Sequence, residues 1–68
     1  MNEFTREICI DKLKAFIDSL AKAKSGELQL YYVNMAEGFL LGLFYADIVT
    51  DKEYRLLLRT IDEAFLAN

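Results

Sequence analysis

The chain has 68 residues, 54% of them hydrophobic, and its eight basic and eleven acidic residues give a net charge of −3. Because non-specific nucleic-acid binding depends on neutralising phosphates with basic residues, this balance argues against a nucleic-acid partner. One cysteine and no histidine exclude an internal disulfide and a Cys/His zinc site, and histidine is the residue that acid–base catalysis most often uses. We therefore expect one domain, residues 1–68, that is not an enzyme and has no catalytic residues, cofactor or metal.

The first helix is predicted at residues 2–24. Four of its apolar residues recur at intervals of four, three and four: Cys9, Leu13, Phe16 and Leu20. This spacing is typical of one face of a helix, so we expect these side chains to contribute to the core. Asn2 is a candidate N-cap, and Gly26 is suited to the left-handed position that closes a helix at its C-terminal end.

The second helix, predicted at residues 26–48, is apolar on both sides. One side spans roughly 140° of arc, and we interpret it as the core face: it holds Gly38 together with Leu28, Tyr31, Tyr32, Met35, Phe39, Gly42, Leu43, Ala46 and Val49. The opposite side is nearly as apolar and holds Leu30, Val33, Ala36, Leu40, Leu41, Phe44 and Ile48. A helix that is apolar all round must be covered all round. The rest of the chain can cover one side, so the other requires a second copy, a partner or a membrane.

Small residues recur along this helix at Gly38, Gly42 and Ala46, each four residues after the last. A glycine inside a helix costs about 1 kcal/mol relative to alanine, so two of them need a reason. Close approach of another helix, within the chain or across a two-fold axis, is one such reason. The alternative is that the fold merely tolerates them.

The third helix is predicted at residues 51–66. Thr50 precedes Glu53 by three residues, which is the spacing of a capping box, and Val49 and Tyr54 are placed for the accompanying hydrophobic staple. The turn before this helix is short, so helices two and three should pack as neighbours. The predicted fold class is all-α: a small three-helix domain, made of a helical hairpin plus one further helix, that associates with itself.

Self-association is predicted because a domain of this size gains little stability from its own core. We expect a homodimer or a higher homo-oligomer built on the second helix. The residues expected at the oligomer or partner interface are Tyr31, Met35, Gly38, Phe39, Leu41, Gly42, Phe44, Tyr45, Ala46 and Tyr54. Tyrosine is enriched at binding hot spots, but core packing explains the tyrosines of this chain equally well.

A membrane span is the main competitor of this hypothesis. Residues 28–49 are long enough to cross a bilayer, but Glu37 would then lie near the middle, where a carboxylate costs about 2.5–3.5 kcal/mol. Glu37 and Asp47 are better explained by a solvent-facing strip or by pairing at a subunit contact. No signal-peptide pattern opens the chain, so we expect a cytoplasmic protein without a membrane partner.

Residues 36–58, AEGFLLGLFYADIVTDKEYRLLL, resemble short all-helical proteins encoded by phages and prophages. In these an apolar helix with glycines runs into a helix start of the form aliphatic-Thr-x-x-Glu-Tyr. The resemblance implies a mobile-element origin and control of a host protein. We therefore expect a non-enzymatic protein that acts through protein–protein interaction. In its most concrete form it is an inhibitor or regulator of a host protein, for example an inhibitor of a defence nuclease that resembles anti-CRISPR proteins. The alternatives are a dimeric transcriptional or DNA-architecture regulator and a structural assembly subunit.

Overall fold

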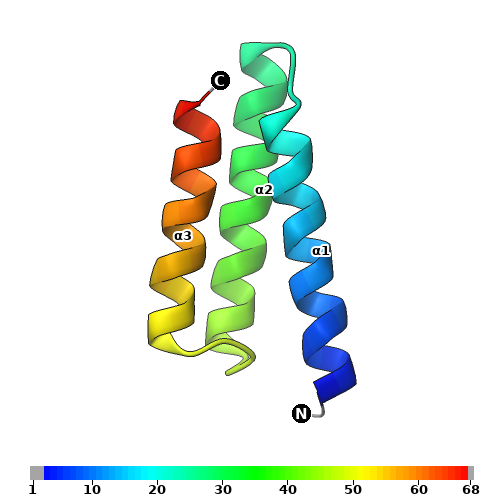
Figure 1. Cartoon of the computed structure of the whole chain (residues 1–68), viewed down its shortest axis with the longest axis vertical. Coiled ribbons are helices and arrows are strands. Elements are labelled where there is room, and N and C mark those ends of the chain that lie inside the picture. The colour runs from blue at the N-terminus through cyan, green and yellow to red at the C-terminus, as the bar shows by residue number, and fades with distance from the viewer. Residues whose placement is uncertain (1–2, 68) are drawn as a thin grey trace.

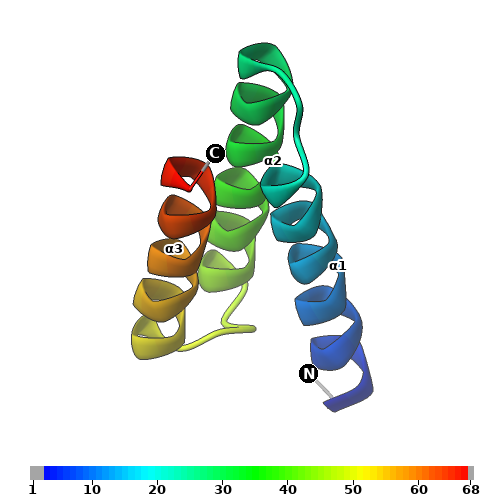
Figure 2. The same cartoon turned by 45° about the horizontal axis from the view of Figure 1, so that its top comes forward.

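The computed structural model describes residues 3–67, which form three α-helices in an up-down-up arrangement (Figure 1). They are α1 (Glu3–Ala21), α2 (Gly26–Tyr45) and α3 (Asp51–Leu66). Every pair of helices is in contact, and α2 lies between α1 and α3 in both views (Figure 2). The prediction of an all-α, three-helix fold is therefore confirmed.

The connection between α1 and α2 differs from the expected one. α1 ends at Ala21 rather than at residue 24, and Ser25 acts as the N-cap of α2, its hydroxyl accepting a hydrogen bond from the Leu28 N–H at 3.2 Å. Gly26 is the first residue of α2, and no glycine among the described residues has a positive φ. The expected left-handed role of Gly26 is wrong, because the serine before it already starts the next helix. Asn2, the expected N-cap of α1, lies outside the described residues.

α2 ends at Tyr45, three residues earlier than expected, because the chain turns back there. Asp47 takes a left-handed conformation with φ of 59°. The Ile48 N–H donates to the Leu43 carbonyl at 2.9 Å, and the Asp47 N–H donates to the Phe44 carbonyl at 3.1 Å. These two bonds form a Schellman motif in which aspartate occupies the position where glycine is usual.

The start of α3 is as predicted. The Thr50 hydroxyl accepts a hydrogen bond from the Glu53 N–H at 3.1 Å, and the Glu53 carboxylate accepts one from the Thr50 N–H at 2.8 Å. This reciprocal pair is the capping box. Val49, directly before it, is buried at 4% exposure, so the turn is anchored in the core.

Among residues 3–67, eight are buried in the core, and they come from all three helices and from the turn before α3: Leu13, Leu20, Val33, Ala36, Leu40, Leu43, Val49 and Ile61. The expectation for α1 is confirmed, since Leu13 and Leu20 are fully buried and Cys9 and Phe16 pack against the core.

The side of α2 that faces the core is rotated relative to the expected one. Leu43 is buried as expected, but Val33, Ala36 and Leu40, predicted to face outward, are buried as well. Gly38 and Gly42, predicted to lie on the core face, are exposed. Interiors are close-packed, and a core face built on two glycines would leave voids. A buried tyrosine hydroxyl also needs a hydrogen-bond partner, so the purely aliphatic side fills the core better than the side that carries glycine and tyrosine.

Candidate functional site

The outward side of α2 presents large apolar side chains to solvent. Six of them are between 39% and 75% exposed: Leu28, Leu30, Tyr31, Met35, Leu41 and Tyr45. The exposed Gly38 and Gly42 lie among them along the helix. We call these eight residues the α2 face. The exposed polar Asn34 also lies within this face. Scattered exposed apolar residues are normal on a protein surface, but a helix face this rich in them marks an interaction site.

Six residues of this face follow a regular spacing of three, four, three, four and three: Leu28, Tyr31, Met35, Gly38, Gly42 and Tyr45. Apolar residues at alternating intervals of three and four form the seam along which two helices pack in a coiled coil. We call this set the α2 seam. The buried residues of α2 lie on the other side of the helix, so the seam is free of contacts that the core already uses.

The glycines of the seam have no function within the chain that the described residues reveal. A Cβ atom added at Gly38 or Gly42 would meet nothing within 4 Å in the part of the chain from residue 3 to 67. The expectation that the glycine ridge allows close helix approach inside the chain is therefore wrong. Each glycine still costs about 1 kcal/mol of helix stability relative to alanine. Any compensation for that cost must come from outside the single chain.

Charged residues are scarce on and beside the α2 face. The whole of α2 contains no lysine or arginine. Asp47 is exposed in the turn that follows the helix, and Glu37 is half-buried rather than solvent-facing. Glu27 is exposed at the first turn. Exposed acidic side chains thus lie at the two ends of the face, and the half-buried Glu37 lies beside its middle.

Seven of the ten residues expected at an interface lie exposed on α2 or directly after it: Tyr31, Met35, Gly38, Leu41, Gly42, Tyr45 and Ala46. The other three, Phe39, Phe44 and Tyr54, are half-buried and pack inside the domain. Phe39 meets Phe16 edge-on with ring centroids 5.6 Å apart, and the rings of Phe44 and Tyr54 are 4.8 Å apart. Intramolecular stacking therefore occupies these rings.

Two exposed leucines, Leu28 and Leu30, were not among the expected interface residues. Leu28 was placed on the core side and Leu30 on the outward side, without being counted as an interface residue. The spacing of the α2 seam could have identified Leu28 as an interface residue, because Leu28 precedes Tyr31 by three residues and so extends the pattern of threes and fours to the start of the helix. Tyr31 also stacks edge-on against Tyr32, with centroids 5.1 Å apart, which fixes its ring on the surface.

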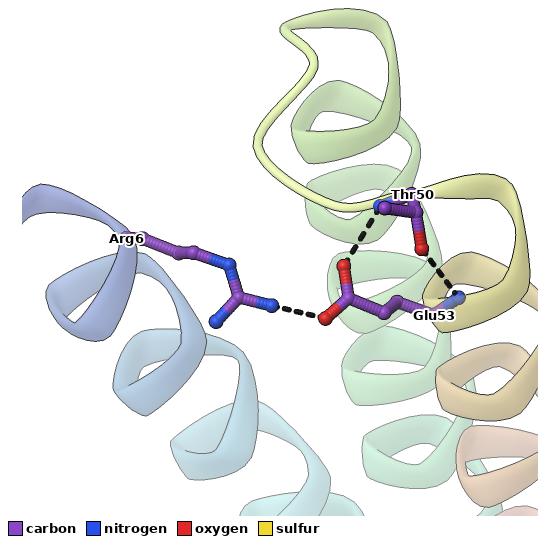
Figure 3. A network of polar contacts seen from close by, with 3 residues as sticks. All are labelled: Arg6, Thr50 and Glu53. Atoms are coloured by element: carbon purple, nitrogen blue, oxygen red, sulfur yellow. Dashed lines mark hydrogen bonds and ion pairs between the residues drawn. The ribbon is translucent and has the colours of Figure 1, made fainter. Parts of the chain in front are cut away.

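A polar contact joins α1 to the start of α3, beside the α2–α3 turn (Figure 3). The Arg6 guanidinium donates to the Glu53 carboxylate, whose other oxygen serves the capping box. The Thr50 N–H bond and the Arg6 charge together hold the pKa of the Glu53 carboxyl below its ordinary value of 4.5. This arrangement fastens the first turns of two helices together, and Glu3 and Asp47 line the same hollow beside it.

The described residues contain no cluster of three or more histidine, cysteine, aspartate or glutamate side chains that could hold a metal ion. Cys9 is a half-buried free thiol. Among residues 3–67, no helix combines the length and hydropathy needed to cross a membrane. Comparison of the chain with protein-family models, curated proteins and solved structures gave no match. The α2 face is thus the feature of the described chain that points most directly to a function.

Proposed function

We propose that this protein acts by binding another protein chain through the α2 face, and that it carries out no chemistry of its own. The observation that supports this most is the α2 seam: six residues at helix-pairing intervals, directed away from the core. Exposed tyrosines at both ends of the seam support it further, because Tyr31 and Tyr45 are of a residue type enriched at binding hot spots.

A protein surface suits this face better than a lipid surface does. Helices that lie on membranes combine an apolar face with lysine and arginine on the polar side. α2 has neither residue. Of the exposed charges at its two ends, Glu27 and Asp47 are acidic and Lys24 is basic. The excess of acidic charge also disfavours a nucleic acid. A second helix with its own apolar face would satisfy both the shape and the lack of charge.

The more specific form of the proposal is an inhibitor or regulator of a host protein. The resemblance of residues 36–58 to phage-encoded helical proteins supports this form, since an inhibitor needs only a binding surface. A DNA-architecture regulator would additionally require a concentrated basic surface, and the basic residues of this chain are scattered. An assembly subunit would require a second apolar face of comparable regularity.

Site-specific photo-crosslinking tests the proposal directly. A benzophenone amino acid is placed at Tyr31 on the α2 face, and in a control protein at Leu56, which is 53% exposed on α3 and therefore equally accessible. Irradiation in the producing cells should yield a discrete protein adduct at position 31 and little at position 56. If position 31 gives no adduct, or only the pattern seen at position 56, the α2 face is not a protein-binding site.

A further inference from the structure

We infer that the occupant of the α2 face is the same face of a second copy of this chain, with the two α2 helices antiparallel about a two-fold axis. The inference rests on the proposed function, because it names a second copy as the protein chain that the α2 face binds. Control of a host protein would then belong to the assembled pair and use another surface. Closed two-fold pairs are the commonest oligomers of soluble proteins, and they require a surface that is complementary to itself. The seam can therefore be tested for self-complementarity residue by residue.

The seam has the same spacing when it is read backwards. Its intervals of three, four, three, four and three are symmetric, so a reversed copy presents its residues at matching heights. The facing pairs are Leu28 with the partner's Tyr45, Tyr31 with the partner's Gly42, and Met35 with the partner's Gly38. Each pair occurs twice because of the two-fold axis, and no seam residue is left without a counterpart.

This register places a large side chain opposite a glycine. Tyr31 would fill the space left by the partner's Gly42, and Met35 the space left by the partner's Gly38. Packing large residues against small ones is how facing helices reach interior packing density. The register also supplies what the single chain lacks, a reason for two helix-interior glycines with open space around them.

A parallel pair is less favourable on the same residues. It would place each seam residue opposite its own copy, so Gly38 would face the partner's Gly38 and Gly42 the partner's Gly42. Two consecutive layers would then lack side chains, and voids of that kind are destabilising.

The helix dipoles favour the antiparallel pair. Reversing one helix sets the positive end of each helix dipole beside the negative end of the other. The side-chain charges do not decide the direction, because the exposed Lys24 and Glu27 of each copy both come to the end that carries the partner's Asp47.

The available area suits a weak, reversible pair. The four large seam residues offer on the order of 100 Å² each, and Leu30 and Leu41 beside the seam add to them, so a symmetric pair would bury roughly 800–1,200 Å² in total. That value lies at or just below the lower end of the range for specific interfaces. We therefore expect a dimer in reversible equilibrium with its monomer.

Disulfide trapping between defined positions tests both the partner and the direction. In a Cys9→Ser background, Leu28→Cys and Tyr45→Cys proteins are purified separately, then oxidised alone and as a mixture. In the antiparallel pair the two copies of position 28 lie about 25 Å apart along the helix, at ~1.5 Å per residue, far beyond disulfide reach. We expect a covalent dimer from the mixture, and background levels from either protein alone. Efficient trapping of either protein alone would overturn the antiparallel arrangement.

The cysteine substitutions could themselves weaken the interface, so the oligomeric state of the unmodified protein is measured separately by sedimentation velocity. We expect a species of twice the 7.9 kDa chain mass at micromolar concentration. Met35→Glu in the seam should remove this species, and Ala15→Glu, at an exposed position of α1, should retain it. A monomeric wild-type protein would overturn the inference. A foreign-protein adduct at position 31 would in that case leave the proposed function standing, whereas no adduct would remove both.

Discussion

Replacing Gly42 by alanine should have opposite effects on the single chain and on the assembled protein. In the single chain the new methyl group meets nothing within 4 Å among the described residues. The substitution then acts only through helix propensity, and it should stabilise the fold by about 1 kcal/mol. For a domain of this size that corresponds to an increase in the melting temperature of roughly 4–8 °C.

In the assembled protein the same methyl group would enter the space assigned to Tyr31 of the partner subunit. Overpacking of this kind typically costs 1–3 kcal/mol, and a free energy of about 1.4 kcal/mol changes a dissociation constant tenfold. We therefore expect the dissociation constant of the Gly42→Ala dimer to be about five-fold to more than about 100-fold higher than that of the wild-type dimer. The two effects can be distinguished by varying the protein concentration, because the stability gained from dimer formation depends on concentration and the stability of the single chain does not.

Melting temperatures measured over a wide range of concentrations show both effects in one experiment. The Gly42→Ala protein should melt above wild type when dilute, and its advantage should shrink or reverse when concentrated. In the monomeric Met35→Glu background the gain should be the same at all concentrations. A constant gain in the wild-type background too, together with an unchanged dissociation constant, would show that Gly42 lies outside any interface.

Three further predictions concern the α2–α3 turn, each measured by urea denaturation in the Met35→Glu background. Thr50→Ala should cost about 0.5–2 kcal/mol, because it removes the hydroxyl that accepts the Glu53 N–H; an unchanged midpoint would contradict the capping box. Asp47→Gly should stabilise the fold by about 0.5–1 kcal/mol and Asp47→Ala should not, since φ at this position is positive. The lowered pKa of Glu53 means that its contribution to stability is present above the ordinary value of 4.5 and is lost as the pH falls through the lower, folded-state pKa. Glu53→Gln should remove this part of the acid dependence, and an identical pH profile would refute it.

Local chemistry was sufficient to predict several elements from the sequence. The start of α3 depends on Thr50 and Glu53, which are three residues apart and satisfy each other's backbone groups without help from the rest of the chain. The core face of α1 could also be predicted, because Leu13 and Leu20 lie on one side of a helix whose other side is largely polar. In both cases the deciding interaction lies within a single helix or its first turn.

The candidate site was predicted only in part. The sequence indicated that α2 is apolar on both sides and that one side must be covered by something other than this chain. It could not indicate which side, because periodicity measures where apolar residues lie and not how well they fill space. The exposed position of Gly38 and the buried position of Leu40 follow from packing against α1 and α3.

The sequence by itself determined the helical class, the first turn of α3 and the surplus of apolar surface on α2, since each follows from residues within one or two helical turns of one another. Only the tertiary structure decided which face of α2 is free and that Arg6 meets Glu53, 47 residues further along the chain. Such choices depend on the volumes and charges that the folded chain brings together. A contact between residues that are distant in sequence has no characteristic spacing, so it cannot be predicted from the sequence pattern.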